Sequence, residues 1–379
     1  MIYADNAATT KLDIEAFKLM TSYLLDDYAN PSQPYSFSRK VKLAIKNARS
    51  TIAKCINADP DEIYFTSGGT ESNNWVIKNF GSTSDIKHII TSEIEHHAVL
   101  RACKHMEEIG ATVKYLSVDE KGLVKTEELN NMFSSVDDPV ISCDTTLVSV
   151  MMANNEIGTI EPIKELVDVA HKHGAYFHAD AVQAVGHIKI DVKALEVDFL
   201  SASAHKFNGP KGIGFLYVRK GTIIQPHNDG GAQENGLRSG TENVAAIIGM
   251  AKALENNVNS MEENKKQLLK YESIIENLLR EKDIRYVRNG YFKHIPGNMS
   301  LSFAGFEGEA ILHRLDLMGI CISTGSACDS QRTQISHVLK AIGIDQELAE
   351  GTIRISLGKN NTEDEVWEIG KALEKVING

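Results

Sequence analysis

The sequence has little of what marks a secreted or membrane protein. Its 379 residues include five cysteines, an odd number, with no CxxC pair and no disulfide-type spacing. The first residues, Met1 to Asn6, do not show the basic region and apolar core of a signal peptide. No apolar run approaches the roughly 20 residues that span a bilayer. We therefore expect a cytoplasmic protein without membrane contacts, in which Cys55, Cys103 and Cys143 are mostly buried free thiols.

An excess of positive charge is also absent. The chain has 40 Lys and Arg residues against 51 Asp and Glu residues, a formal net charge of −11. An acidic chain repels phosphate backbones at long range, so nucleic acid is not expected as a direct partner. Metal-ligand spacing is absent as well. His171 and His173 are two residues apart in a helical stretch, so they point to different sides and cannot hold one metal ion.

The length favours two domains. From about residue 60 to residue 220, short apolar runs alternate with helical stretches such as Ile163–His173, a pattern typical of an α/β fold with a largely parallel sheet. Seven strands are expected, at Glu62–Thr66, His88–Thr91, Thr112–Leu116, Thr146–Met151, Tyr176–Ala179, Phe199–Ser203 and Gly214–Val218.

The last third of the chain predicts a smaller α+β domain. Apolar residues recur at helical spacing through residues 268–278 and 366–377, and Thr362 with Glu365 forms a capping box before the second helix. Short strand-like runs lie between them, at Met299–Phe303 and Ile353–Leu357. We expect a large domain of residues 14–254 and a small domain made of residues 1–13 and 255–379.

A Gly-rich turn joins a strand to a helix between Phe65 and Asn73, where the sequence reads FTSGGTESN. Free N–H groups and the helix dipole form an anion site at such a helix start, so Gly69 and Thr70 are candidates for binding a phosphate. The alternative is an ordinary tight turn in which Thr70 caps the helix.

Two polar residues follow expected strands at one edge of the sheet. Asp180 lies just past one strand, and Lys206 follows 26 residues later, after the next. Ligands gather at this carboxyl edge, where a carboxylate can hold a proton on a heterocyclic nitrogen and a desolvated lysine can form a Schiff base. The alternatives are a helix cap for Asp180 and a solvated surface position for Lys206. A phosphate cup, a Schiff-base lysine and an acid at a ring nitrogen are what pyridoxal phosphate requires.

Cys328 lies in a stretch of small and polar residues, Ser323–Ser330. A cysteine in such a loop is more exposed than is usual for its type, which favours a reactive thiol. The alternative is an incidental thiol.

These segments together resemble the cysteine desulfurases, in the class V aminotransferase branch of fold-type-I pyridoxal-phosphate enzymes. The sequence Gly-Ser-Ala-Cys at Cys328 is similar to that of the nitrogen-fixation and iron–sulfur-cluster group, whereas Tyr35 and Ser38 differ from the family's usual His and Gly. The motifs cover nearly the whole chain: Asp5–Thr10, Asn30–Ser32, Thr66–Asn74, Glu95-His96, Asn154–Gly158, Asp180–Gln183, His205-Lys206, Arg238–Asn243, Gly325–Cys328 and Arg354–Gly358.

The resemblance implies a fold-type-I transferase with a mostly parallel seven-stranded sheet between helices and a smaller C-terminal α+β domain that carries Cys328. It implies that Lys206 binds the cofactor and moves protons, that Asp180 keeps the ring nitrogen protonated, and that His96 stacks on the ring and acts in acid–base steps. The further roles that it implies are Gln183 and Asn155 near the ring hydroxyl, Gly69, Thr70, Ser203 and His205 at the phosphate, Thr241 at the phosphate of a neighbouring subunit in a homodimer, and Arg354 with Asn30 and Asn155 at the substrate.

The implied reaction releases alanine from L-cysteine and leaves a persulfide on Cys328, which passes the sulfur to an acceptor protein in iron–sulfur cluster assembly or in tRNA or cofactor thiolation. No resident metal is implied, although Cys328 could transiently ligate a nascent iron–sulfur cluster. The alternatives are a selenocysteine lyase, another class V aminotransferase, and a non-catalytic scaffold for sulfur-trafficking partners.

Overall fold

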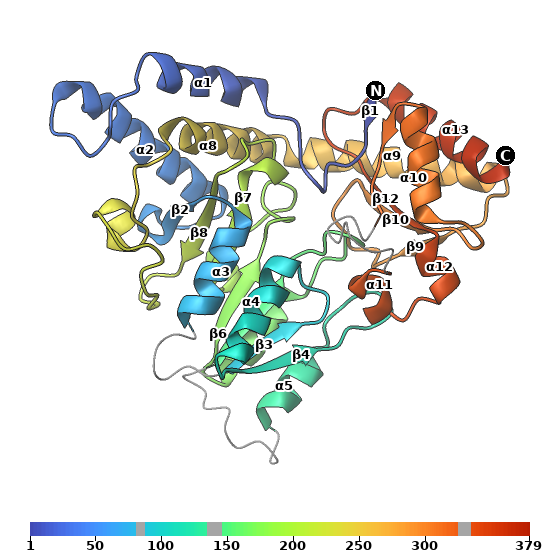
Figure 1. The fold of residues 1–379 in the computed structure, drawn as a ribbon, viewed down its shortest axis with the longest axis horizontal. Coiled ribbons are helices and arrows are strands. Elements are labelled where there is room, and N and C mark those ends of the chain that lie inside the picture. The colour runs from blue at the N-terminus through green and yellow to red at the C-terminus, as the bar shows by residue number, and fades with distance from the viewer. Residues whose placement is uncertain (81–87, 135–145, 325–334) are drawn as a thin grey trace.

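A seven-stranded sheet forms the centre of the larger part of the molecule (Figure 1). The computed structural model describes residues 1–80, 88–134, 146–324 and 335–379, so Cys143 and Cys328 lie outside the described residues. The strand order is β2-β8-β7-β6-β5-β3-β4, and all neighbours are parallel except at β8, which is antiparallel to both β2 and β7. The strands are β2 (Ile63–Thr66), β3 (His88–Ser92), β4 (Thr112–Leu116), β5 (Thr146–Met151), β6 (Tyr176–Asp180), β7 (Phe199–Ser203) and β8 (Gly214–Val218).

These strands confirm the predicted largely parallel sheet, and each coincides with its predicted run to within one residue at either end. Strands β5, β7 and β8 are buried along their whole length. Such burial on both faces is the reason their sequences are almost continuously apolar.

Helices cover both faces of this sheet. One buried cluster joins strand residues such as Ile90 and Val148 to α2, α5, α6 and α8. A second cluster joins the alternate residues, Ile89 and Leu147, to α3 and α4. Because successive side chains point to opposite faces of a strand, the two clusters are the two sides of one layered structure. The helices of this part are α1 (Ile14–Leu25), α2 (Ser36–Cys55), α3 (Gly69–Phe80), α4 (His97–Glu108), α5 (Thr126–Ser134), α6 (Ile163–Lys172), α7 (Val192–Leu195) and α8 (Val244–Asn259).

A third buried cluster forms the core of the smaller part. It lies between helices and two small sheets, of which one is antiparallel in the order β12-β10-β9 and the other pairs β1 with β11 in parallel. The expected capping box of Thr362 and Glu365 is present at the start of α13. The elements are β1 (Ile2–Tyr3), α9 (Met261–Glu281), β9 (Val287–Asn289), β10 (Asn298–Ser302), α10 (Gly308–Leu317), β11 (Ile320–Cys321), α11 (His337–Ala341), α12 (Gln346–Glu350), β12 (Thr352–Ser356) and α13 (Glu363–Asn378).

The N-terminal segment belongs to the core of the smaller part, since Ile2 and Ala4 are buried there. Figure 1 shows this end of the chain beside α10 and α13, far from α1. The predicted boundary after residue 254 falls inside α8, and Val338 and Leu339 of α11 pack in the larger cluster. The division into residues 14–254 on one side and 1–13 with 255–379 on the other therefore stays a prediction.

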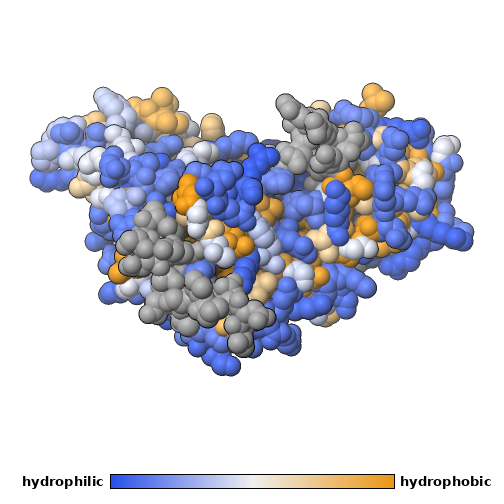
Figure 2. All heavy atoms as spheres, turned by 60° about the horizontal axis from the view of Figure 1, so that its bottom comes forward, coloured by the Kyte–Doolittle hydropathy of each residue, from blue (hydrophilic) through white to orange (hydrophobic). Residues whose placement is uncertain are grey.

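Hydrophilic side chains cover most of the face that Figure 2 shows, and hydrophobic atoms form small groups among them. Within the described ranges, none of the helices has both the length and the apolar composition needed to cross a membrane. Cys55, Cys103 and Cys321 are free thiols, and Cys103 is buried as expected, whereas Cys55 is partly exposed.

Candidate active site

A cavity of about 300 Å³ opens at the carboxyl ends of β6 and β7. Its size is within the range of small-molecule and cofactor sites. It is walled by the start of α3, by Ala7 and Ala8 of the N-terminal segment, and by the strand ends. Ten of the residues predicted from the sequence line it: Gly69, Thr70, His96, Asn155, Asp180, Gln183, Ser203, His205, Lys206 and Arg354.

Two predicted residues, Asn30 and Thr241, do not line this cavity, and the structure does not describe a third. Asn30 is exposed and accepts a hydrogen bond from the Ser32 N–H at 2.9 Å within its own turn. Thr241 is exposed and does not line the cavity of its own chain. Cys328 lies outside the described residues. The roles of all three stay predictions.

Strand β7 and the short 3₁₀ turn after it, Ala204–Lys206, deliver Lys206 to the cavity. Its Nζ donates hydrogen bonds to the carbonyl oxygens of Ala7 at 2.6 Å and Ala8 at 2.8 Å. Its own carbonyl oxygen is 2.9 Å from His187 Nε2. The contact with His187 fixes the backbone of Lys206, and its side chain lines the cavity.

Asp180 ends strand β6 with both carboxylate oxygens fixed. Oδ1 accepts a hydrogen bond from the Val182 N–H at 3.0 Å, and Oδ2 accepts one from Asn73 Nδ2 at 2.6 Å. Burial raises the pKa of Asp180, while Val182, His96, Asn73 and Lys206 oppose that rise. Each oxygen keeps a further lone pair, so the carboxylate can accept a proton-bearing nitrogen from the cavity.

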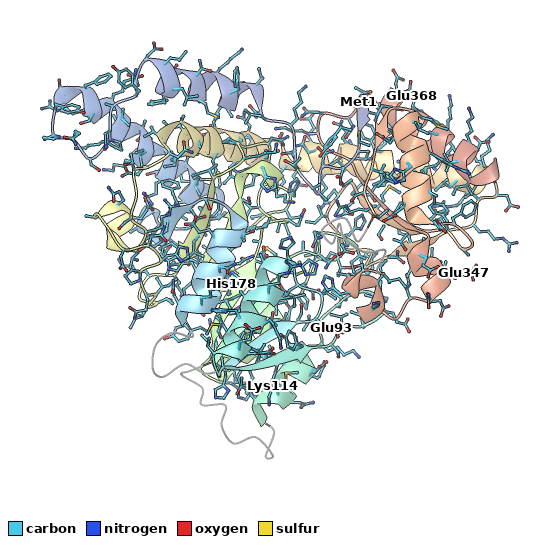
Figure 3. The ribbon with its side chains drawn as sticks, in the orientation of Figure 1. Met1, Glu93, Lys114, His178, Glu347 and Glu368 are labelled. Carbon is cyan, nitrogen blue, oxygen red and sulfur yellow. The ribbon has the colours of Figure 1, made fainter. Side chains whose placement is uncertain are left out.

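His178 ties together the strands that carry these groups. It is fully buried in β6, with Nδ1 2.8 Å from Ser149 Oγ on β5 and Nε2 2.9 Å from Ser201 Oγ on β7. Figure 3 places it among the strands of the large sheet, well away from Glu347 and Glu368 of the smaller part. Burial lowers its pKa to about 3, so it bridges the strands as a neutral ring. This cross-strand link fixes the relative positions of Asp180 and Lys206.

His96 is both the N-cap of α4 and part of the cavity wall. Its Nδ1 accepts a hydrogen bond from the Ala98 N–H at 3.1 Å, which fixes the orientation of the ring. Burial lowers the pKa of His96, with Lys206 acting in the same direction and Asp180 against it. The ring is therefore neutral at pH 7, with its proton on Nε2.

The start of α3, where a phosphate-binding cup is predicted, lines the cavity. The helix begins at Gly69, so Thr70 lies in its first turn rather than at the N-cap. A side chain at Gly69 would meet Val182 Cγ2 at 2.4 Å from the added Cβ, so the position requires glycine. Burial, with the charges of Lys206 and Lys211, lowers the pKa of His205 to about 4, so its ring is neutral beside the cup.

Arg354 reaches the cavity from β12 with its side chain only 7% exposed. Nη1 donates a hydrogen bond to the Asn155 carbonyl oxygen at 3.0 Å, and Nη2 forms an ion pair with Asp5 Oδ1 at 2.7 Å. Its buried Nε has no partner among the described residues. A buried donor without a partner is costly, so this edge of the guanidinium is suited to an anionic ligand.

Asn73 and Asp5 are site residues that the sequence motifs did not reveal as such. Asn73 is four residues after Gly69, so helical spacing places both on one face of α3, and this signal could have found it. Asp5 is 349 residues from Arg354 in the chain, and no local pattern predicts their ion pair. Arg238 supports the cup from outside, because its Nε is 2.9 Å from Glu71 Oε1 in the first turn of α3.

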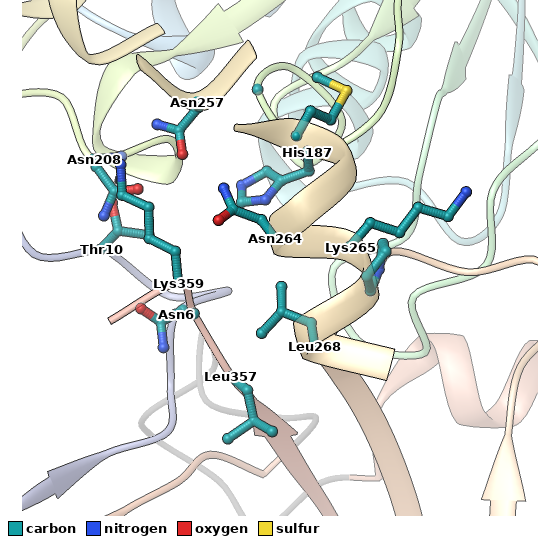
Figure 4. Close-up of a pocket in the computed structure, with 14 residues that line it drawn as sticks. Asn6, Thr10, His187, Asn208, Asn257, Asn264, Lys265, Leu268, Leu357 and Lys359 are labelled. Atoms are coloured by element: carbon teal, nitrogen blue, oxygen red, sulfur yellow. Dashed lines mark hydrogen bonds between the residues drawn. The ribbon is translucent and has the colours of Figure 1, made fainter. Parts of the chain in front are cut away.

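A second, smaller cavity lies behind the site (Figure 4). It has about 30 Å³, enough for one or two water molecules. His187 lines it, together with asparagine side chains from several segments, among them Asn208, Asn257 and Asn264. It is too small for a substrate. No group of three or more His, Cys, Asp or Glu side chains in the described part of the chain is arranged to hold a metal ion.

Comparisons with known proteins agree with this arrangement. Residues 2–369 match the family model for aminotransferase class-V. The chain belongs to this family. Within it, a protein named cysteine desulfurase IscS from Dictyoglomus turgidum is 47% identical over an alignment of length 382, which covers 99% of this chain and 94% of that protein.

The named relative belongs to the cysteine desulfurase branch of the family, and two solved structures agree with the assignment to the family. A NifS-like protein superimposes with a TM-score of 0.92 at 38% identity, over 100% of this chain and 99% of that one. A structure described as SspA in complex with cysteine superimposes with a TM-score of 0.82 at 34% identity, over 96% of this chain and 100% of that one. The expected fold type I is confirmed, and the enzymes of this branch depend on pyridoxal phosphate.

The residues present fit that cofactor. Gly69, where an added Cβ would clash with Val182, lets the backbone at the start of α3 line the cavity. Asp180 is placed to hold a protonated ring nitrogen, and the Lys206 amine lies in the same cavity. Asn73 lines this cavity too, and its buried Oδ1 has no partner among the described residues.

Proposed function

We propose that this enzyme removes sulfur from L-cysteine with pyridoxal phosphate and passes it, through Cys328, to an acceptor protein. The observation that carries the proposal is the convergence of Lys206, Asp180 and Arg354 on one cavity, from three segments far apart in the sequence. An amine, an acid for a ring nitrogen and a guanidinium for a carboxylate are the groups that an amino-acid substrate and this cofactor need together.

When bound, the cofactor supplies an aldehyde that captures amines and a ring that stores an electron pair. Lys206 Nζ would hold the cofactor and would take the proton from the substrate Cα. Asp180 would keep a proton on the ring nitrogen; burial raises the pKa of this carboxyl group, and the hydrogen bonds from Val182 and Asn73 oppose that rise. The neutral His96 ring excludes water and holds a proton on Nε2 for transfer.

Arg354 orients the substrate by binding its carboxylate through the unpartnered Nε and the neighbouring Nη. We expect Arg354→Lys to raise KM for L-cysteine about 10- to 100-fold with a smaller change in kcat, since a two-point charged hydrogen bond contributes about 1.5–3 kcal/mol. Steady-state kinetics would measure this. Arg219→Lys, which changes an arginine paired with Glu196 and Asp198 away from the cavity, is the matched control. An unchanged KM in Arg354→Lys would place the carboxylate elsewhere.

Cys328 is proposed as the group that receives the sulfur. Its thiolate attacks the substrate sulfur, so that a bond forms between the two sulfurs while the substrate carbon–sulfur bond breaks. The electrons of that bond remain on the carbon, which is then protonated, and alanine leaves. Cysteine and a thiol are thereby converted to alanine and a persulfide, with no external oxidant or reductant.

Replacement of Cys328 tests this route. We expect Cys328→Ala to abolish sulfide release from L-cysteine while the protein stays yellow and loaded with cofactor, because cofactor binding uses other residues. Alanine production and mass-spectrometric mapping of the persulfide in the wild-type protein complete the experiment. Cys321→Ala is the control, since this thiol lies on β11 and does not line the cavity. Undiminished turnover in Cys328→Ala would exclude the persulfide route.

We further propose a homodimer in which Thr241 reaches the phosphate of the neighbouring subunit. Two observations support it. Thr241 is exposed and apart from the cavity of its own chain. Helix α1 has only one buried residue, Ala16, although it is rich in apolar side chains. Phe17, Leu24 and Leu25 are 52%, 61% and 69% exposed, as expected of a face that another subunit covers.

The acceptor of the sulfur is proposed to be a scaffold for iron–sulfur cluster assembly or a thiolation enzyme, and a cytoplasmic location stays a prediction. Selenocysteine lyase is the second candidate. The Cys328→Ala variant separates the two, because selenium release that survives the loss of Cys328 would favour the lyase. A non-catalytic scaffold is disfavoured by the complete set of Lys206, Asp180 and His96.

A further inference from the structure

Glu156 is a buried carboxyl group that the proposed reaction does not use. It is 6% exposed and follows Asn155 in the turn after β5. Asn154 holds this turn rigidly, because its Oδ1 accepts hydrogen bonds from the N–H groups of Glu156 at 2.8 Å and Ile157 at 3.0 Å. The position of the Glu156 side chain is therefore set by the turn itself.

The carboxylate of Glu156 contacts the start of α11. Ser336, the N-cap of that helix, is 7% exposed and donates its hydroxyl proton to Glu156 Oε2 at 2.6 Å. Ser336 Oγ also accepts a hydrogen bond from the Val338 N–H at 3.0 Å. Since a hydroxyl has one proton, the capping bond and the bond to Glu156 together fix the orientation of Ser336.

The same turn also supports the cavity. The Asn155 carbonyl oxygen, one residue before Glu156, accepts the hydrogen bond from Arg354 Nη1 at 3.0 Å. Asn155 itself lines the cavity. Ser336 follows Cys328 by eight residues in the sequence. Glu156 thus lies between the residues that orient the substrate and Ser336, at the start of α11.

We propose that Glu156 is a positioning residue for sulfur transfer, which fixes Ser336 and α11 to the turn that holds Asn155 and Arg354. The inference rests on the proposed role of Cys328 as sulfur acceptor. Its physical basis is the length of the chain: the eight residues from Cys328 to Ser336 span at most about 29 Å, so fixing Ser336 to the Asn155 turn limits how far Cys328 can lie from the substrate.

The anchor is expected to respond to pH. Burial raises the pKa of Glu156 to about 7, against the opposing effects of Ser336 and Arg354. Two groups face the Glu156 carboxylate: the Ser336 hydroxyl from α11 and the Arg354 guanidinium from β12. Arg354 is itself paired with Asp5. His337, next on α11, is instead 3.0 Å from the Glu95 carbonyl oxygen through Nε2. A hydroxyl bonds an ionised carboxylate more strongly than a neutral one, so the anchor tightens as pH rises through about 7.

Hydrogen exchange tests the anchor without relying on turnover. In the cofactor-loaded enzyme at pH 8 without cysteine, we expect the Val338 and Leu339 amides to exchange about 10-fold faster in Ser336→Ala, and several-fold faster in Glu156→Gln, than in wild type. Glu161→Gln is the matched control. Glu161 is also a buried carboxyl group with its pKa raised, but its Oε2 accepts a hydrogen bond from Val124, not from α11. Wild-type exchange in both test variants would overturn the proposal.

Single-turnover formation of the Cys328 persulfide tests the consequence. We expect a rate about 10-fold lower in Ser336→Ala at pH 8, with cofactor absorbance and the spectral response to cysteine unchanged. The wild-type rate divided by the Glu156→Gln rate should rise between pH 6 and pH 8. Ionisation of the Cys328 thiol changes both rates in the same proportion, so it does not change this ratio.

These experiments distinguish a failure of the role of Glu156 from a failure of the proposed function. Wild-type persulfide rates in both variants, with Cys328 labelled, would overturn the role of Glu156 alone. Absence of any persulfide on Cys328 in the wild-type enzyme would overturn the proposed function and this role with it.

Discussion

Alanine in place of Lys206 is expected to lower turnover of L-cysteine by about 10³-fold or more, because one residue both binds the cofactor covalently and moves the Cα proton. The yellow absorbance should be weaker and no longer typical of a lysine-bound cofactor. Borohydride should label a peptide that contains Lys206 in the wild-type protein and none in the variant. The structure supports this assignment, since the amine already points into the cavity with two backbone carbonyl oxygens as partners.

Lys211→Ala is the matched control for this prediction. Lys211 is five residues further along the same loop and is exposed, so its loss should leave turnover near the wild-type level. The Lys206→Ala protein should also fold, because the Nζ hydrogen bonds to Ala7 and Ala8 lie at the cavity rather than in a hydrophobic core. If Lys206→Ala kept substantial turnover, or if borohydride labelled another lysine, the assignment of the cavity as the catalytic site would be wrong.

Asp180→Asn is expected to lower kcat by roughly 100-fold or more, because it removes the charge that keeps the ring nitrogen protonated. Asparagine has nearly the same shape and can still accept the hydrogen bond from Val182, so cofactor binding should weaken far less than turnover. The pH profile of kcat should also change, since the variant loses a charge that raises the pKa of His96.

Asp198→Asn provides a control of the same chemistry. Asp198 is also buried, and its Oδ2 is 2.9 Å from His171 Nε2, but it does not line the cavity. We expect a loss of stability in this variant without a comparable loss of kcat. Equal kinetic effects of the two substitutions would mean that Asp180 acts only through the fold.

The strands and the carboxyl-edge residues could be predicted from the sequence because their signals are local. Buried parallel strands are short apolar runs, and their carboxyl ends meet at one edge, so the sequence alone was enough to place Asp180 and Lys206 together. The predicted α/β sheet and capping box followed from the same kind of pattern.

The rest depends on contacts between residues far apart in the chain. The pairing of β1 with β11 joins two-residue strands that carry no pattern of their own. The ion pair of Asp5 with Arg354 forms within the smaller part, and the hydrogen bond of Ser336 with Glu156 joins α11 to the larger part, but both link segments that are far apart in the chain. Helical spacing from Gly69 could have identified Asn73 as a site residue. It could not have predicted the hydrogen bond from Asn73 to Asp180, which is 107 residues away.

The N-terminal segment has a consequence for how the molecule is made. Strand β1 pairs with β11, and the Ala7 N–H donates a hydrogen bond to Ser356 Oγ. On the ribosome, residues 2–7 therefore emerge long before the strands that hold them. The seven-stranded sheet has all its strands by residue 218 and can form earlier. The substrate-binding wall is thus completed only late in synthesis, which delays binding of the amino acid until these distant segments of the polypeptide have met.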